Sequence, residues 1–151
     1  MRIAIIGGGA AGFMAAITAK LHNGKNEVVL FEKSNKVLAK VKISGGGRCN
    51  VTNACFSVSQ LIKNYPRGEK FLKNAFHHFY TQDTIDWFES RGVPLKAEAD
   101  NRMFPISDNS QSIVDCLMNE IDKLGVELKL QSVISKIEKV EDKIHQLIIK
   151  I

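Results

Sequence analysis

Three glycines near the N-terminus have the spacing of a turn that holds the pyrophosphate of a dinucleotide. Gly7, Gly9 and Gly12 follow an apolar, β-branched run, and Ala10 and Ala11 stand before the third glycine. In a strand–turn–helix unit of this kind, the first glycine permits a tight turn and the second lets phosphate approach the backbone. The third lets the helix and the strand pack closely. The N–H groups that open the helix are then available to the phosphates.

An acidic side chain stands where a site of this kind binds ribose. Glu32 ends the second apolar run, about twenty residues after Gly12, where a carboxylate accepts hydrogen bonds from ribose hydroxyls and disfavours a 2′-phosphate. FAD or NAD is therefore favoured over NADP. Glycines of this spacing are common, but the strand before them, the helix after them and this acid make the signal more specific. Lys33 follows directly and adds positive charge near the phosphates.

A second glycine-rich stretch, residues 42–53, also has the composition of a ligand-binding loop. A glycine inside a helix or strand costs about 1 kcal/mol, so three in a row fit best where the backbone lies against a ligand or has positive φ. The guanidinium of Arg48 is a planar donor fork suited to phosphate. A flexible surface loop is the alternative interpretation. The residues predicted to contact the cofactor here are Lys42, Ser44, Gly45, Gly46, Gly47, Arg48, Asn50 and Thr52.

The hydrophobic pattern places these groups on an α/β framework. Residues 2–7 and 27–32 are predicted to be parallel strands joined by a helix over residues 10–22, with a right-handed crossover. Residues 33–57 have no clear periodicity, and residues 58–92 have a helical pattern. The remaining pattern predicts a hairpin, an amphipathic helix and three further strands, over residues 95–104, 113–124, 126–130, 133–140 and 144–151.

The predicted elements divide the chain by role into three segments. Residues 1–57 hold the strand–helix–strand unit and the glycine–arginine loop. Residues 58–108 form a helical and hairpin insertion. Residues 109–151 contain a helix, the third strand of the sheet and the start of a β-meander.

Composition excludes several classes of protein. The chain has 151 residues, of which 44% are hydrophobic, enough for one domain with a core. No apolar run approaches the roughly 18 residues of a membrane-spanning helix, so we expect no membrane partner. Three cysteines form neither an even set nor a CxxC pair, which favours a reducing, cytoplasmic setting. For Cys49 we favour a packing role over a redox role.

The positive charge is concentrated near the predicted phosphate site. The net charge is +5, and residues 1–50 hold eight Lys or Arg against two Glu. One interpretation is a solvated basic surface, which is common for lysines. The more specific interpretation is that the charge attracts an anionic cofactor or substrate. No RNA-binding aromatic motif, zinc finger or basic helix accompanies the charge, so we expect no nucleic-acid partner. His77 and His78 are adjacent and point apart on a helix, so we expect no metal site.

Four stretches together resemble one family of flavoproteins. They are the glycine turn at residues 7–12, Glu32-Lys33, the run from Lys42 to Asn53 and the run from Arg102 to Ser107. The combination is similar to the HI0933-like (YhiN/BaiN-type) flavoproteins, NAD(P)/FAD-dependent oxidoreductases related to the glutathione-reductase superfamily. The stretch Gly-Gly-Gly-Arg-Cys-Asn-Val-Thr-Asn is the specific part of the resemblance. The chain has Met103-Phe104-Pro105 where relatives often have Val-Phe-Pro, a mild change.

The resemblance implies a fold, a cofactor and a reaction class. The fold is a three-layer FAD/NAD(P)-binding Rossmann-like domain, here incomplete, with the insertion facing the flavin. FAD is the implied cofactor, with NAD(P)H as the reductant and a small organic molecule as the substrate. The backbone of Val133 is implied to meet the adenine, and the loop from Ser44 to Asn53 to lie beside the flavin. Because family members are much longer, we expect the chain to be an N-terminal fragment that is inactive alone.

The sequence leaves other features open. A Rossmann dehydrogenase or sensor that binds NAD without flavin is the alternative to an FAD enzyme. The flavin itself carries out redox chemistry, so a flavoenzyme need not show an acid–base pair, and we assign no catalytic residue. The sequence does not predict the substrate, the oligomeric state or the choice between NADH and NADPH.

Overall fold

The chain folds into two compact units. The structure, a computed structural model, describes residues 1–140 and 143–150. The terminal unit is Met1–Val41 together with Leu117–Ile151, and the central unit is Lys42–Cys116. The three segments predicted from the sequence are defined by role rather than by compactness, and their boundaries stay a prediction.

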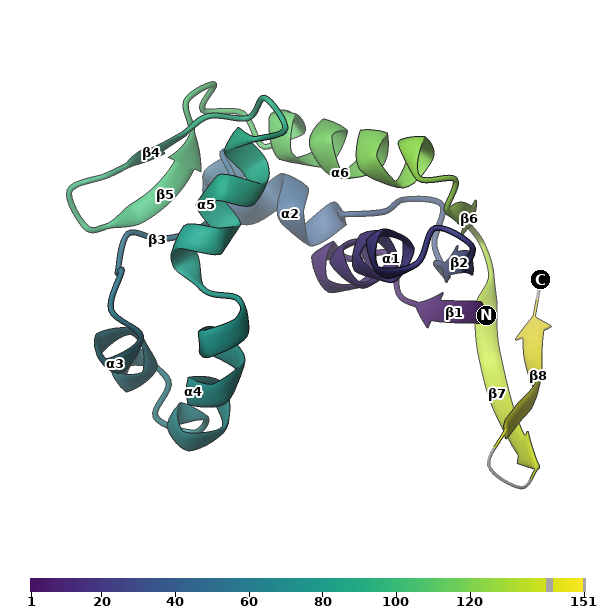
Figure 1. The fold of residues 1–151 in the computed structure, drawn as a ribbon. Coiled ribbons are helices and arrows are strands. Elements are labelled where there is room, and N and C mark those ends of the chain that lie inside the picture. Colours follow the sequence, from purple (N-terminus) through teal and green to yellow (C-terminus); the bar gives the residue numbers. More distant parts are fainter. Residues whose placement is uncertain (141–142, 151) are drawn as a thin grey trace. The chain divides into compact units, whose positions relative to one another are not determined.

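A parallel sheet forms the centre of the terminal unit. Its strand order is β1-β2-β6, and both strand pairs are parallel. Helix α1 packs on β1 and β2 and buries Phe13, Ala16 and Ile17 (Figure 1). Val28 and Leu30 of β2 are also buried, as expected for the face of the sheet that a helix covers. The elements are β1 (Arg2–Ile6), α1 (Ala10–His22), β2 (Glu27–Phe31), the end of α6 (Gln111–Lys123), β6 (Glu127–Lys129), β7 (Val133–Val140) and β8 (Lys143–Lys150).

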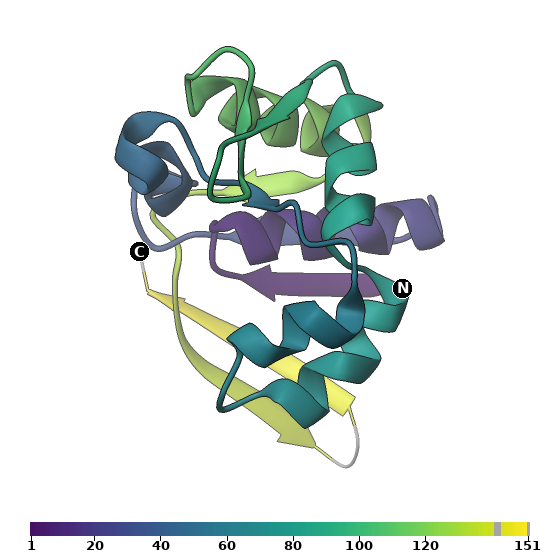
Figure 2. The ribbon, with the colours of Figure 1, turned by 90° about the vertical axis from the view of Figure 1, so that its left-hand side faces the viewer.

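These elements agree with the sequence pattern. The predicted strand–helix–strand unit is present, and α6 buries Ile113, Leu117 and Ile121 at helical spacing. Strands β7 and β8, yellow in Figure 2, pair in antiparallel fashion. Glu141 and Asp142, between the predicted strands of residues 133–140 and 144–151, lie outside the described residues, as does residue 151.

A small antiparallel sheet and several short helices form the central unit. The strand order is β3-β5-β4. Asn101, with φ +64°, lies in the turn between β4 and β5, the two strands of the hairpin predicted over residues 95–104. The elements are the end of α2 (Ala39–Ile43), the 3-10 helix η1 (Ser44–Gly47), β3 (Thr52–Asn53), α3 (Val58–Leu61), η2 (Ile62–Asn64), α4 (Glu69–His78), α5 (Thr81–Glu89), β4 (Leu95–Ala97) and β5 (Arg102–Pro105).

Two parts of the central unit differ from expectation. The sequence pattern did not predict α2 or η1, because helices of five and four residues are too short to show a helical period. The aromatic residues of α4 share one helical face, a pattern that favours packing in the core or at a domain interface; burial in the core is not observed, and an interface role stays a prediction. Phe71 is 82% exposed, and α4 buries none of its residues.

Candidate functional site

The glycine turn between β1 and α1 contains two glycines that the fold itself requires. Gly7 has φ +110° and donates its N–H to the carbonyl oxygen of Phe31 at 2.7 Å. A Cβ on Gly12 would lie 1.9 Å from the Gly7 oxygen, so no larger residue fits there. Gly9 is different: its φ is −91°, and an added Cβ would meet nothing within 4 Å. The space beside Gly9 is therefore open to a ligand.

The first turn of α1 presents unpaired donors beside that open space. The helix begins at Ala10, and its first backbone bond runs from Phe13 N–H to the Gly9 oxygen. None of the described residues accepts a hydrogen bond from the N–H groups of Ala10, Ala11 or Gly12. Such groups, at the positive end of a helix dipole, form an anion-binding site.

Glu32 lies beside the same turn and is held by backbone donors. Its Oε2 accepts the N–H of Gly8 at 2.8 Å, and its Oε1 accepts the N–H and hydroxyl of Ser34, each at 2.9 Å. The hydrogen bond from the Ser34 backbone, followed by that from Gly8, keeps the pKa of Glu32 below its ordinary value. The carboxylate is therefore ionised at neutral pH, and its further lone pairs can still accept ribose hydroxyls.

Gly8 is a residue that the sequence interpretation missed. Besides donating to Glu32, it accepts the N–H of Leu38 at 2.8 Å. A Cβ on Gly8 would lie 2.7 Å from Val37 Cγ1 and 3.0 Å from Glu32 Cβ. Gly8 thus joins the turn to the segment after β2. The sequence did carry a signal, the uninterrupted run Gly7-Gly8-Gly9. The dinucleotide-binding spacing requires glycine only at positions 7 and 9, so the glycine at position 8 needed a separate explanation.

The chain also brings the start of β7 next to Glu32. Ser132 donates its N–H to the Glu32 carbonyl at 2.9 Å, and Gln131 donates to Ser34 at 3.0 Å. Val133 follows directly and is 42% exposed, while Lys33 is exposed beside Glu32. The terminal unit therefore assembles all of its predicted cofactor residues at the carboxyl ends of β1 and β2. Contact of Val133 with adenine stays a prediction.

The second glycine loop is an ordered turn of the central unit. Gly45, Gly46 and Gly47 have φ values of +57°, +69° and +85°, in the left-handed region. Ser110 holds the loop at both ends, since its N–H donates to Gly47 and its hydroxyl donates to Lys42, each at 2.8 Å. The backbone conformation of the loop is therefore enough to explain why glycine occupies these three positions.

Gly45 is also required by packing. A Cβ at this position would lie 2.7 Å from Cε1 of Phe104 and 2.9 Å from the backbone nitrogen of Asn50. Phe104 is fully buried, so its ring has little room to move. Cys49 is buried as well, and burial raises the pKa of its thiol. A protonated, buried thiol supports the packing role expected for this residue.

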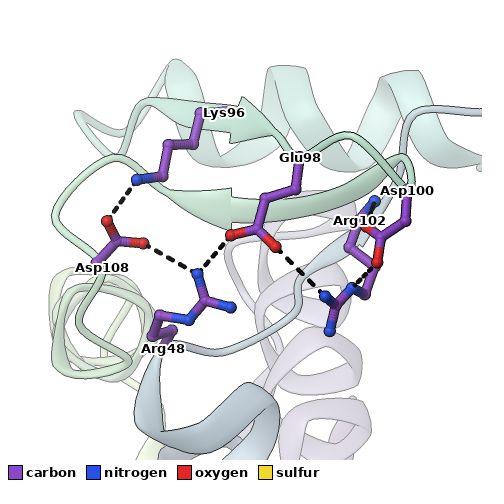
Figure 3. A network of polar contacts seen from close by, with 6 residues as sticks. All are labelled: Arg48, Lys96, Glu98, Asp100, Arg102 and Asp108. Carbon is purple, nitrogen blue, oxygen red and sulfur yellow. Dashed lines mark hydrogen bonds and ion pairs between the residues drawn. The ribbon is translucent and has the colours of Figure 1, made fainter.

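Arg48 lies in a charged cluster within the central unit (Figure 3). Its Nη1 is 2.5 Å from Glu98 Oε1 and 3.5 Å from Asp108 Oδ1, and its guanidinium carbon is 4.0 Å from the Phe104 ring centroid. The hydrogen bond to Glu98 raises the pKa of Arg48 further. The fork that was predicted to face phosphate thus faces two carboxylates, and a cofactor contact by Arg48 stays a prediction.

Three further residues complete this cluster. Lys96 pairs with Asp108, and Arg102 is 3.4 Å from Glu98 Oε2 and 2.7 Å from Asp100 Oδ2. The hydrogen bond from Lys96 lowers the pKa of Asp108, and the backbone N–H of Arg102 lowers that of Asp100. Three cations and three anions balance, so the cluster ties the glycine loop to the β4–β5 hairpin without a net charge.

A cavity of about 330 Å³ lies within the central unit, and the residues directly after Arg48 and Cys49 form part of its wall. Asn50 and Thr52, both predicted cofactor contacts, contribute to its wall. The side-chain amide nitrogen of Asn50 faces two backbone carbonyl oxygens and donates to both, to Thr52 O at 2.9 Å and to Met103 O at 3.3 Å. The cavity is lined by aromatic and polar groups, including Asn53, Tyr65, Phe76, Phe79, Tyr80 and Thr84.

The two groups of predicted residues are therefore each assembled within one unit. In residues 1–140 and 143–150, no cluster of His, Cys, Asp or Glu has the composition of a metal site. No helix in that part of the chain is long and apolar enough to cross a bilayer. The cytoplasmic location stays a prediction.

The family follows from comparison with known proteins. The family model of the HI0933-like protein Rossmann domain matches residues 1–150. The chain belongs to this family. Both the family resemblance and the Rossmann-like α/β fold predicted from the sequence are confirmed. In the solved structure of the Thermovibrio ammonificans THI4 protein, the same fold covers 99% of this chain and 47% of that one, with a TM-score of 0.62 and 13% identity.

Two curated relatives have named activities. A 3-dehydro-bile acid delta(4,6)-reductase of Clostridium scindens is 32% identical over 84% of this chain and 30% of the relative. A ribosomal RNA dihydrouridine synthase of Haemophilus influenzae is 33% identical over 91% of this chain and 33% of the relative. The HI0933-like chain thus spans about a third of the length of the curated relatives it matches.

Proposed function

We propose that the complete protein is an FAD-dependent reductase that adds two electrons and two protons across a carbon–carbon double bond conjugated to a carbonyl group. NAD(P)H supplies the electron pair and one proton as hydride, and solvent supplies the second proton. The observation that carries dinucleotide binding, on which the proposal rests, is the glycine turn, in which Gly9 leaves open space beside unpaired N–H groups of α1.

The residues of the terminal unit fit FAD. The first turn of α1 would bind the pyrophosphate through Ala10, Ala11 and Gly12, and Glu32 would accept the ribose hydroxyls. The segment at Val133 lies next to Glu32 through the bond from Ser132, which suits a backbone contact with adenine. When bound, FAD supplies the redox chemistry itself. The chain's own residues would bind FAD and stabilise its negatively charged pyrophosphate.

The reaction class rests on the names of the two relatives. A delta(4,6)-reductase and a dihydrouridine synthase both saturate a carbon–carbon double bond. In a 3-dehydro steroid and in uracil that bond is conjugated to a carbonyl, so the carbonyl can accept the electron density that arrives at the far carbon. The cavity beside Asn50 and Thr52 is the candidate substrate pocket, because its aromatic walls suit a flat, conjugated ring.

A visible absorption spectrum of the complete protein tests the cofactor. We expect maxima at about 370 and 450 nm, release of FAD on denaturation, and bleaching of both maxima when NADH or NADPH is added without oxygen. A colourless protein that stays colourless with added FAD would contradict the proposal. Bleaching by dithionite but by neither nicotinamide would retain FAD and reject NAD(P)H as the reductant.

The alternative is a Rossmann module that binds NAD and no flavin, and the same glycine turn would serve it. Thermal stabilisation separates the two, because a ligand that binds only the folded state stabilises it by RT ln(1 + L/Kd), where L is the free ligand concentration. This stabilisation is larger for the ligand with the lower Kd at equal concentration. At equal concentrations FAD should raise the melting temperature more than NAD does. A larger rise with NAD would favour the alternative.

A further inference from the structure

Ser34 supplies most of the hydrogen bonds that hold the Glu32 carboxylate. Its backbone N–H and its hydroxyl each lie 2.9 Å from Oε1, and the N–H of Gly8 lies 2.8 Å from Oε2. Within residues 1–140 and 143–150 this carboxylate accepts no other hydrogen bond. Because a carboxylate oxygen accepts about two hydrogen bonds, Ser34 can fill Oε1 completely, whereas Oε2 retains a site for one more donor.

The Ser34 hydroxyl has two acceptors within reach but only one proton. Its oxygen lies 2.6 Å from the Lys36 carbonyl oxygen and 2.9 Å from Glu32 Oε1. Because a hydroxyl donates one hydrogen bond at a time, a turn of this proton towards Lys36 frees one site on Oε1. A ligand hydroxyl can then take that site and restore the donor that the carboxylate loses. Both oxygens of Glu32 would accept from the ligand in that arrangement.

The backbone of Ser34 also reaches the segment that precedes β7. Its carbonyl oxygen accepts the N–H of Gln131 at 3.0 Å, beside the bond from Ser132 to the Glu32 carbonyl at 2.9 Å. Val133, whose backbone is predicted to meet adenine, follows directly. The turn from Glu32 to Ser34 therefore connects the ribose acceptor with the segment expected to contact the base. All of these residues belong to the terminal unit.

We propose that Ser34 is the positioning residue of the adenosine site. It holds the Glu32 carboxylate in the orientation that accepts the ribose 2′-hydroxyl, and its own hydroxyl turns to the Lys36 carbonyl when the ligand binds. Ser34 acts through Glu32 and need not touch the ligand. The inference rests on the dinucleotide site of the proposed function but not on the flavin, because the ADP moiety is common to FAD and NAD.

A double-mutant cycle tests whether Ser34 acts through Glu32. Calorimetric titration of the complete, cofactor-free protein with ADP gives the dissociation constants. Ser34→Ala should weaken ADP about fivefold, the effect of one hydrogen bond. In the Glu32→Ala background the same substitution should change ADP affinity less than about twofold, because the carboxylate that Ser34 positions is absent. Equal losses in both backgrounds would show that Ser34 only braces the turn and would overturn the proposal.

Selectivity for the ribose hydroxyl gives a second readout that a bracing role would not change. The wild type should bind ADP about tenfold or more tightly than 2′-deoxy-ADP, because the deoxy ligand lacks a hydrogen bond to a charged acceptor. Ser34→Ala should narrow this ratio by about fivefold and leave the affinity for 2′-deoxy-ADP unchanged. Equal weakening of both ligands, or a wild-type ratio of about one, would overturn the proposal.

Two further variants serve as controls. Ser34→Thr keeps the hydroxyl and should retain the ADP affinity and the ribose selectivity of the wild type. Asn35→Ala removes a neighbouring exposed side chain that forms no hydrogen bond with the described part of the chain, and it should change neither quantity. A loss in Asn35→Ala equal to that in Ser34→Ala would assign the effect to the turn as a whole and overturn the role of the hydroxyl.

The outcome can be separated from the proposed function. A wild type that contains FAD and is bleached by NAD(P)H, together with equal losses of ADP affinity in both backgrounds, would overturn the role of Ser34 and leave the reductase proposal intact. A protein that binds no flavin but shows the expected ADP cycle would reject the reductase proposal and retain the role of Ser34. A wild type that binds neither FAD nor ADP would reject both.

Discussion

The chain contains two glycine-rich turns that look alike in sequence and differ in what makes their glycines necessary. In the terminal unit, Gly12 is fixed by the approach of α1 to the Gly7 oxygen, while Gly9 faces open space. In the central unit, three consecutive glycines have left-handed torsions, and Gly45 also packs against Phe104. The first turn thus combines a structural glycine with one that a ligand would require, whereas the second is explained by its own backbone.

The charged residues beside the two turns differ in the same way. Glu32 is bound to backbone donors and retains lone pairs for a ligand. Arg48 is paired with Glu98 and Asp108 and stacked on Phe104. Among the described residues, Glu32 therefore has no cationic partner within ion-pair distance, whereas Arg48 is paired with two carboxylates. Five measurements test this difference between the two turns.

The largest effect is expected from Gly12→Ala. The new Cβ would overlap the Gly7 oxygen, so β1 and α1 would have to separate, at a cost of about 3 kcal/mol or more in the free energy of unfolding. Urea denaturation of the complete protein measures it. Gly24→Ala is the matched control, because Gly24 has open space around its Cα. A cost below about 1 kcal/mol for Gly12→Ala, the ordinary value for a point substitution, would show that the turn is not as tight as described.

Gly45→Ala should cost about 2–3 kcal/mol of unfolding free energy. Part is the left-handed torsion, about 1–2 kcal/mol for a residue with a Cβ, and the rest is contact with Phe104 and the Asn50 nitrogen. Gly46→Ala carries only the torsional part, since its Cβ would meet nothing within 4 Å. Chemical denaturation of both variants gives the difference. Equal costs would remove the ring contact from the explanation of this loop.

Glu32→Ala should weaken FAD binding by about 1.5–3 kcal/mol, the value of a hydrogen bond to a charged group. Titration of the FAD-stripped complete protein with FAD measures the dissociation constant. The alanine variant also removes the acceptor for Gly8, so Glu32→Gln serves as the control that keeps an acceptor oxygen while losing the charge. Unchanged FAD affinity in both variants would place the ribose elsewhere.

Gly9→Ala should separate ligand binding from folding. The helix cap loses about 1 kcal/mol or less, since the backbone of Gly9 suits any residue. A methyl group between the backbone and the pyrophosphate should nevertheless weaken FAD about tenfold, equal to about 1.4 kcal/mol. Parallel measurements of melting temperature and FAD affinity test this. Normal FAD affinity would make the open space at Gly9 irrelevant to the cofactor.

The smallest effect is a loss of stability in acid. The pKa values of Glu32, Asp100 and Asp108 lie below their ordinary values, so the stability they contribute is present above about pH 4. This stability is lost as the pH falls through the lowered pKa values of the folded protein. The reason is that these carboxylates bind protons more readily in the unfolded chain than in the folded one. Melting temperature between neutral and acid pH measures it. Asp108→Asn should make that curve shallower.

The sequence was a good guide where neighbouring residues decide the structure. The spacing of Gly7, Gly9 and Gly12 and the apolar runs around them predicted the strand, turn and helix, because each depends on contacts within a few residues. Nothing in the pattern indicated α2, which is too short for a period, or the exposure of Phe71. Helical spacing shows that residues share a face, but not whether anything covers that face.

The chemistry of the two loops was only half determined by sequence. The types and spacing of the glycines and of Glu32 predicted a dinucleotide-binding turn, since the expected ligand contacts come from the local backbone. The partners of Arg48 could not be predicted, because Glu98 lies fifty residues away and Asp108 farther still. Only the tertiary structure brings these carboxylates to the guanidinium. It alone decides that Glu32 is held by hydrogen-bond donors next to the first loop while Arg48 of the second is paired with carboxylates within the fold.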